Sequence, residues 1–202
     1  NRAAGWRELQ PEFFHVLSRA LEIAELTGGA FDPALGDVVD RLGFGSGQSG
    51  AVIPGERSET RDLSGHHDSG STGPGSPAAL RAEGAIPAGV ALDLSSIAKG
   101  YAVDMCAQRL RGLGVPGFLM EIGGEFVGQG VKPDAQPWRV ALELSDIAPA
   151  PGEPPATDIA LVNLAVATSG DFVRRRGGVS HLVEGRTGEA PRGGLSGVAV
   201  MH

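Results

Sequence analysis

The chain has 202 residues and a formal net charge of −7, with 41% hydrophobic and 20% charged residues. A chain of this length can bury one sizeable core, and its composition is that of an ordinary globular protein. The acidic balance argues against a nucleic-acid-binding protein, because such a protein needs clustered positive charge. The concentrated basic run is short, Arg174, Arg175 and Arg176. Cys106 is the single cysteine, which excludes an intramolecular disulfide and a cysteine-based metal site.

No stretch of the sequence approaches the roughly 20 consecutive apolar residues that a membrane-spanning helix requires. We also see no secretory signal peptide, because the chain opens with Asn1 and Arg2 and soon enters a helical pattern. A mature or shortened chain would look the same, so the sequence leaves the cellular location open.

A strong helical pattern starts at Pro11, a residue favoured in the first turn of a helix. The helix is predicted to end at Gly28 and Gly29, where glycine can take the left-handed conformation that ends helices. Residues 27–33 are interpreted first as a helix cap and turn, and second as a loop that lies against a flat ligand. The predicted apolar face of the helix holds Phe13, Phe14, Val16, Leu17, Ala20, Leu21 and Ala24.

Residues 45–89 are rich in Gly, Ser, Pro, Asp and His and show almost no apolar periodicity. Such a segment cannot bury enough apolar surface to become ordered, so we predict a mobile excursion. His66, His67 and Asp68 have the chemistry of metal ligands, but solvated histidines are the favoured interpretation in a low-complexity loop.

A second helix is predicted after the apolar residues 90–92, which we expect to form a strand. Asp93, Ser95 and Ser96 offer side-chain oxygens to the free amides of the helix start. Asp93 and Lys99 then flank the first turn, where the helix dipole favours an anion. On spacing alone, a capped helix with a surface lysine is the simpler interpretation. Its expected apolar face, ending before Gly114, holds Ala98, Tyr101, Ala102, Met105, Cys106, Leu110 and Leu113.

Most of the remaining chain has the patterns of β-strands. Strands are predicted at residues 118–122, 138–144, 159–167, 181–184 and 198–201. With two principal helices, they predict an α+β fold of mixed, mostly antiparallel strands in a single domain over residues 1–202. The chain lacks a phosphate-binding loop, a His-Glu-x-x-His motif and a nucleophile elbow.

Polar residues stand at several of the glycine-bounded segment ends. They are Asp32, Asp93 with Lys99, Glu125, Ser169 with Asp171, and His181. If these residues converge, their carboxylates, lysine and histidine suit a phosphorylated ligand with a divalent cation.

Five short blocks of sequence occur in a distinctive order. They are Thr-Gly-Gly-Ala-Phe-Asp-Pro at 27–33, Asp-Leu-Ser-Ser-Ile-Ala-Lys-Gly-Tyr-Ala-Val-Asp at 93–104, Ile-Gly-Gly-Glu at 122–125, Thr-Ser-Gly-Asp at 168–171 and His-Leu-Val-Glu-Gly-Arg-Thr-Gly at 181–188. Each block alone is weak, but the ordered set resembles the ApbE family of FAD:protein FMN transferases. The resemblance covers nearly the whole chain except residues 45–89, and it implies lobes around a flavin-nucleotide cleft.

The resemblance also implies an activity, which is Mg²⁺-dependent transfer of the FMN half of FAD to a Thr or Ser hydroxyl, with release of AMP. The acceptor would be a subunit or domain of a membrane redox complex. The protein would be bacterial, at the cell envelope or in the cytoplasm. Two alternatives stay open, Mg²⁺-dependent hydrolysis of FAD to FMN and AMP, and a flavin-binding module without catalysis.

Site roles follow from the same resemblance, residue by residue. The flavin-nucleotide loop is matched by Ala30, Phe31 and Asp32, and other FAD-contacting positions by Asp93, Lys99 and, less closely, Ser196. Ser96 matches a position whose backbone carbonyl helps to hold Mg²⁺, and His181 matches the catalytic histidine. A neutral imidazole with a pKa of about 6.5 can accept the proton of an attacking hydroxyl.

Among its departures from the family pattern, two concern the expected site. Glu184 and Gly185 stand where the family usually has Asp-Pro. The family also completes its Mg²⁺ site from a helix that follows the last strand, and this chain ends at His202 before such a helix.

Overall fold

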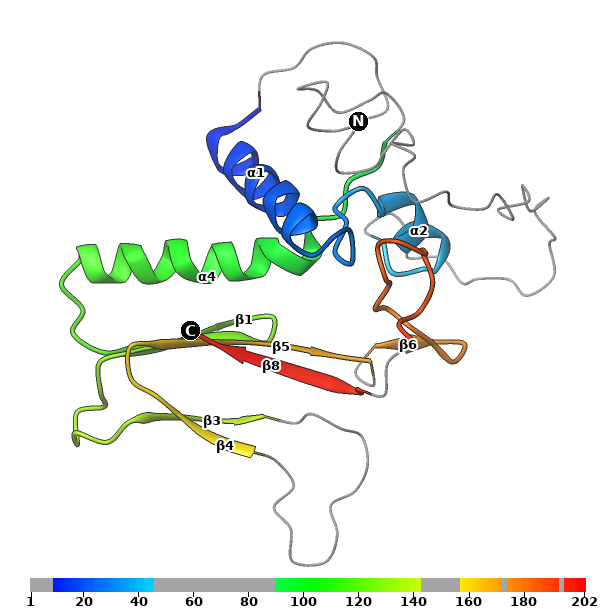
Figure 1. The fold of residues 1–202 in the computed structure, drawn as a ribbon. Helices are drawn as coiled ribbons and strands as arrows, with labels where there is room; N and C mark the ends of the chain where they lie inside the picture. The colour runs from blue at the N-terminus through cyan, green and yellow to red at the C-terminus, as the bar shows by residue number, and fades with distance from the viewer. Residues whose placement is uncertain (1–8, 46–89, 143–156, 172–173, 193–194) are drawn as a thin grey trace, which may run out of the picture. The chain divides into compact units, whose positions relative to one another are not determined.

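The structure is a computed structural model that describes residues 9–45, 90–142, 157–171, 174–192 and 195–202 (Figure 1). Apart from Gly45, the predicted mobile excursion at residues 45–89 lies outside the described residues. The chain divides into two compact units. The first unit is Asn1–Leu94 with Val183–Glu189, and the second is Ser95–Leu182 with Ala190–His202. The single domain expected for residues 1–202 stays a prediction.

The first unit contains two helices, α1 (Pro11–Leu26) and α2 (Gly36–Arg41). Helix α1 confirms the first predicted helix, and its buried residues Val16, Leu17, Ala20 and Ala24 all belong to the predicted apolar face. Phe13 and Phe14, expected on the same face, are exposed. Helix α2 was not predicted, because six residues are too few to show a helical period.

The second unit is built on a four-stranded antiparallel sheet with the strand order β1-β2-β5-β8. Its strands are β1 (Phe118–Ile122), β2 (Glu125–Gln129), β5 (Leu164–Gly170) and β8 (Gly197–Met201). Helix α4 (Ser95–Gly112) lies along one face of this sheet (Figure 1).

The other face of the sheet is covered by a two-stranded sheet of β3 (Trp138–Leu142) and β4 (Thr157–Leu161) (Figure 1). A third, small sheet pairs β6 (Arg175–Arg176) with β7 (Val179–Ser180). The α+β class predicted from the sequence is confirmed. Among the described residues, no helix is long and apolar enough to cross a membrane.

The four-stranded sheet separates two hydrophobic cores, because successive strand residues point to opposite faces. Under α4, the buried residues are Val103, Ala107, Phe118 and Val127. Under β3 and β4, they are Val140, Leu142, Leu161 and Val166. The second unit therefore consists of three layers, with the sheet in the middle.

Helix α4 has nearly the predicted span, but the face that meets the sheet shares Leu110 with the predicted apolar face and is otherwise centred on other residues. Its buried residues are Val103 and Ala107, with Leu110 packed beside them. Met105, Cys106 and Leu113, which were expected on the apolar face, are exposed. Small and apolar residues occur on several sides of this helix, so spacing alone did not identify the side that meets the sheet.

The strands at 118–122 and 198–201 are confirmed, and the strand predicted from residue 138 is present as β3. The single strand expected at 159–167 is wrong, because β4 and β5 are separated by a turn. Asn163 in that turn has a φ of 56°, a left-handed conformation that Asn tolerates. The strands expected at 90–92 and 181–184 are also wrong, since neither segment has strand structure.

Candidate functional site

The loop expected to contact flavin begins where α1 ends. Gly28 and Gly29 have φ values of 59° and 82°. Their amides donate to the carbonyls of Glu25 (3.0 Å) and Ala24 (2.8 Å), the pattern of a Schellman helix end. The cap-and-turn interpretation of residues 27–33 is therefore confirmed, and contact with flavin stays a prediction.

Two side chains fix the path of this loop. The Thr27 hydroxyl oxygen accepts a hydrogen bond from the Phe31 amide at 3.2 Å. The Asp32 carboxylate accepts one from the Ala34 amide at 2.8 Å, which forms an Asx turn around Pro33.

The segment before α4 lies beside the same loop. The Asp93 amide donates to the Pro33 carbonyl at 2.9 Å, and the Gly36 amide donates to the Ala91 carbonyl at 3.0 Å. These two bonds replace the strand that we expected at residues 90–92. Asp93 comes 61 positions after Asp32 in the sequence, and the bond to Pro33 places it next to the residue that follows Asp32.

Residues 183–189 complete the first unit by packing against the loop. The Gly185 amide donates to the Ala30 carbonyl at 2.8 Å. A Cβ atom at Gly185 would overlap the Gly29 carbonyl oxygen and would lie 2.9 Å from the Asp32 Cβ. The close approach therefore leaves no space for a side chain at position 185.

Within residues 183–189, an ion pair joins two side chains that are close in the sequence. The Arg186 guanidinium binds the Glu184 carboxylate, with Nε 2.8 Å from Oε1. The Glu184 carbonyl accepts the Gly188 amide at 2.8 Å. The first unit thus brings Ala30, Phe31, Asp32 and Asp93 together with residues 183–189. The sequence had predicted the end of a strand and a following turn for this segment.

Burial raises the pKa of the Asp32 carboxyl above its ordinary value of 3.8, while the hydrogen bond from Ala34 acts in the opposite direction. A carboxyl with a raised pKa binds its proton more tightly in the folded protein than in the unfolded one. Its contribution to stability is therefore complete below pH 3.8 and is lost as the pH rises through the folded pKa.

We expect Asp32→Asn to gain stability relative to the parent as the pH rises from below 3.8 through the raised pKa of the Asp32 carboxyl. Asparagine keeps an oxygen for the Ala34 amide but carries no charge. Urea unfolding of both proteins across this range measures the difference in unfolding free energy. A difference that is constant with pH, or that falls, would contradict the expected effect.

In the second unit, Lys99 lies on the packed side of α4, four residues before Val103 and eight before Ala107. Its Nζ donates to the Gly123 carbonyl at 2.8 Å and lies 2.8 Å from both carboxylate oxygens of Glu125. Glu125 faces the helix because it shares the strand alternation of buried Val127. The ammonium group expected at the FAD site is therefore held by the turn between β1 and β2.

The side chain of Glu125 is only 13% exposed, whereas that of Lys99 is 41% exposed. We expect Lys99→Met to destabilise the protein by about 1–2 kcal/mol, because it leaves a mostly buried carboxylate without its cation. The double variant with Glu125→Gln should lose less than the sum of the single variants, since neither charge then remains. Additive losses in denaturant unfolding would show that the pair does not contribute to stability.

Ser96 is the second residue of α4 and is exposed. Within the described ranges, no group of three or more His, Cys, Asp and Glu side chains could hold a metal ion. Mg²⁺ is usually bound by one or two carboxylates together with water and phosphate oxygens. Since such a site needs fewer than three of these side chains, Mg²⁺ binding with Ser96 as a partial ligand stays a prediction.

His181 follows the hairpin of β6 and β7 and is hydrogen-bonded to Arg174, the residue before β6. The backbone amide of His181 donates to the Arg174 carbonyl at 3.2 Å, and the ring Nδ1 lies 3.1 Å from the same oxygen. Because a carbonyl oxygen can only accept, Nδ1 carries the proton in this contact, and Nε2 is the basic nitrogen of the neutral ring. On the other side, the Ser180 hydroxyl accepts the Leu182 amide at 3.1 Å.

Asp171 joins this hairpin to the end of the four-stranded sheet. The Asp171 carbonyl accepts Nε of Arg175 at 2.8 Å, and its carboxylate lies 3.2 Å from the same guanidinium. The Asp171 amide donates to the Ser196 carbonyl at 2.9 Å. Strand β8 begins opposite Gly170 at the end of β5, whereas β2 pairs with β5 from Phe126 opposite Val166. The second unit thus brings Ser196 to the hairpin that carries His181, while Lys99 is held at the turn between β1 and β2.

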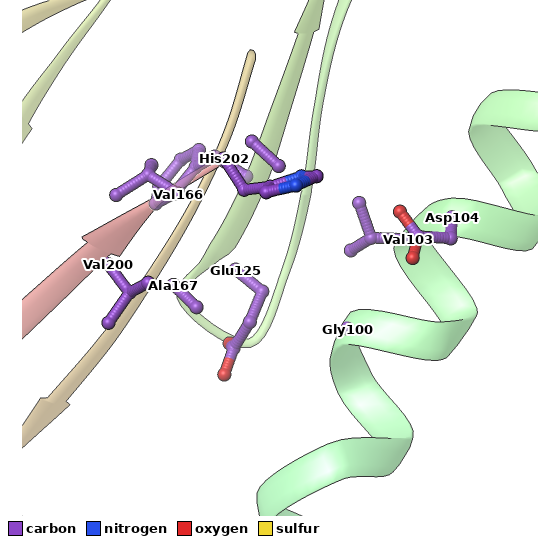
Figure 2. Close-up of a pocket in the computed structure, with 10 residues that line it drawn as sticks. Gly100, Val103, Asp104, Glu125, Val166, Ala167, Val200 and His202 are labelled. Atoms are coloured by element: carbon purple, nitrogen blue, oxygen red, sulfur yellow. The ribbon is translucent and has the colours of Figure 1, made fainter. Parts of the chain in front are cut away.

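A pocket lies between α4 and the sheet of the second unit (Figure 2). Asp104 and Glu125 contribute carboxylates, and His202 contributes an imidazole that points from the sheet toward α4. None of the eight residues expected at the flavin or metal site lines this pocket. Sequence reasoning missed it because its strand residues had the pattern of core. The lining residues are Gly100, Val103, Asp104, Glu125, Phe126, Ala165, Val166, Ala167, Val200 and His202.

Comparison with known proteins gives consistent matches. The model of the ApbE family matches residues 1–202. The chain is similar to the FAD:protein FMN transferase of Haemophilus influenzae, with 30% identity over 96% of this chain and 56% of the relative. It is also similar to that of Vibrio cholerae, with 31% identity over 92% of this chain and 54% of the relative. The chain thus spans about half the length of these curated relatives.

Solved structures show the same similarity. The flavin transferase ApbE from Vibrio cholerae superposes with a TM-score of 0.69 and 26% identity, over 96% of this chain and 60% of that one. The apo form of the Pseudomonas stutzeri flavinyl transferase ApbE gives a TM-score of 0.72 and 27% identity, over 100% of this chain and 61% of that one.

Proposed function

The chain belongs to the ApbE family, and from this premise we propose that the protein transfers the FMN half of FAD to a Thr or Ser hydroxyl of an acceptor protein and releases AMP. The relatives that match most of this chain are named FAD:protein FMN transferases, which supports flavin transfer. The geometric observation that carries the proposal is the contact between His181 Nδ1 and the Arg174 carbonyl. It gives the ring the tautomer that a general base needs.

In the proposed reaction, the acceptor oxygen attacks the phosphorus atom on the FMN side of the FAD pyrophosphate. A bond forms between that oxygen and phosphorus, and the bond from phosphorus to the bridging oxygen breaks. AMP leaves with the bridging oxygen, and Nε2 of His181 takes the proton of the hydroxyl. Proton transfer of this kind typically accelerates a reaction by ~10² to 10⁴.

The other residues would bind and orient the substrate. The loop with Ala30, Phe31 and Asp32 would contact the flavin nucleotide, as would Asp93 and Ser196. Lys99 would place its positive charge near the pyrophosphate, and Glu125 would hold that ammonium in position. Neutralised charge and fixed geometry contribute most of the catalysis in phosphoryl transfer.

Dependence on Mg²⁺ is part of the proposal, with the Ser96 carbonyl as one ligand. When bound, the ion would neutralise charge on the phosphates. The acceptor would be a subunit or domain of a membrane redox complex in a bacterium, and the protein would act at the cell envelope or in the cytoplasm.

The experiment that tests this function measures two products of one reaction. The full-length protein is incubated with FAD, Mg²⁺ and a flavin-acceptor domain, and released AMP and acceptor-bound FMN are quantified. Transfer predicts equal amounts of both. AMP without acceptor-bound flavin would instead indicate FAD hydrolysis, and bound FAD without either product would indicate a flavin-binding module.

A further inference from the structure

The hairpin that precedes the proposed base is too short to hold its own position. Its strands β6 and β7 contain two residues each. The turn between them consists of Gly177 and Gly178, with φ values of 56° and 83°. Even a longer isolated hairpin is at best marginally stable in water. His181 follows this hairpin directly, so the direction of its imidazole depends on contacts that fix the hairpin to the rest of the second unit.

Arg175, the first residue of β6, joins the hairpin to the end of β5. Its Nε donates to the Asp171 carbonyl at 2.8 Å, and its Nη2 lies 3.2 Å from a carboxylate oxygen of the same residue. Asp171 comes directly after Gly170, the last residue of β5, and its amide donates to the Ser196 carbonyl at 2.9 Å. The planar guanidinium therefore connects the hairpin, through two contacts, to a residue that is itself fixed at the end of the four-stranded sheet.

The same arginine lies beside both backbone segments that orient the base. It directly follows Arg174, whose carbonyl accepts the amide of His181 and contacts its Nδ1. It also pairs across the hairpin with Ser180, the residue before His181. A displacement of Arg175 would therefore move the imidazole from both sides.

We propose that Asp171 and Arg175 are positioning residues for the transfer reaction, which hold the hairpin so that Nε2 of His181 meets the attacking hydroxyl. This inference rests on the proposed function. An exposed ion pair contributes little to stability, and these two side chains are 34% and 43% exposed. A base that is misplaced by about 1 Å, in contrast, can lower a reaction rate by about 10². The pair should therefore matter more for the transfer rate than for the stability of the fold.

The test uses Arg175→Gln and Asp171→Asn in the full-length protein, each alone and combined with His181→Ala. Asp171→Asn is the milder change, since its backbone carbonyl can still accept Nε of Arg175. Arg139→Gln is the matched control, because Arg139 makes a similar exposed ion pair with Asp158 across β3 and β4. The single-turnover rate of FMN transfer is measured at saturating FAD and acceptor. The Kd for FAD and the urea concentration at half-unfolding are measured on the same preparations.

Arg175→Gln should lower the rate by about tenfold or more, and Asp171→Asn should lower it by less. Arg139→Gln should keep the parental rate, and the Kd for FAD should change little in all variants. In the His181→Ala background, Arg175→Gln should change the remaining rate by less than about twofold, because the base that it positions is absent. The same loss in both backgrounds would overturn the inference, as would a parental rate in Arg175→Gln.

Two other results would also overturn the positioning role. A higher Kd for FAD in Arg175→Gln would assign the guanidinium to the nucleotide phosphates, and a loss of rate that matches the fraction of unfolded protein would make the pair purely structural. Failure of the proposed function would be recognised separately, by a parent that transfers no FMN or by a His181→Ala enzyme with the parental rate.

Discussion

Replacing His181 with alanine should lower the rate of FMN transfer by ~10² to 10⁴, the usual contribution of a general base. The variant should still bind FAD, because the backbone hydrogen bond from position 181 to the Arg174 carbonyl does not depend on the side chain. The rate of acceptor flavinylation and the Kd for FAD, measured on the same preparations, test both parts.

The control for this variant is His15→Ala, which removes an exposed imidazole from α1. It should leave the transfer rate unchanged. A His181→Ala enzyme with the parental transfer rate would exclude the proposed base.

Substituting Gly185 with alanine is expected to destabilise the protein by about 1–3 kcal/mol or more, because it inserts a methyl group where there is no space. The added Cβ would overlap the Gly29 carbonyl oxygen and would lie 3.1 Å from the Ala30 carbonyl oxygen. The loop with Ala30, Phe31 and Asp32 must then move, so the affinity for FAD should fall as well. Denaturant unfolding and FAD titration measure the two effects.

Gly112→Ala is the matched control, since a Cβ there would meet no atom within 4 Å. Gly112 is the last residue of α4, and alanine in a helix is favoured over glycine by roughly 0.5–1 kcal/mol. The control should therefore be neutral or stabilising. If Gly185→Ala and Gly112→Ala were equally stable and bound FAD equally well, the close approach at Gly185 would have no energetic role.

Much of the fold followed from local sequence patterns. Pro11 and Gly28 correctly marked the two ends of α1, because each residue has a backbone preference that suits its position. Strand β1 was predicted at its observed bounds from one apolar run before two glycines. The same rule failed at Asn163, since the turn there is set by the backbone conformation of one residue inside a continuous apolar run.

The candidate site was harder to predict from the sequence, because its contacts join residues that are distant in the chain. The residue types at positions 32, 93, 99 and 181 indicated a site, but no local pattern paired Lys99 with Glu125 or His181 with Arg174. Gly185 looked like an ordinary turn glycine, and only its contact with the loop after α1 showed why a larger residue does not fit. The buried side of α4 also depended on the sheet it covers, which spacing within the helix did not reveal.

The most direct measurement is intact-mass analysis of a flavin-acceptor domain after incubation with the full-length protein, FAD and Mg²⁺. We predict a mass gain equal to one FMN, which is absent when EDTA is added and is strongly slowed in the His181→Ala variant. An acceptor of unchanged mass, with an active relative flavinylating the same acceptor in parallel, would contradict the proposal that this protein is an FMN transferase.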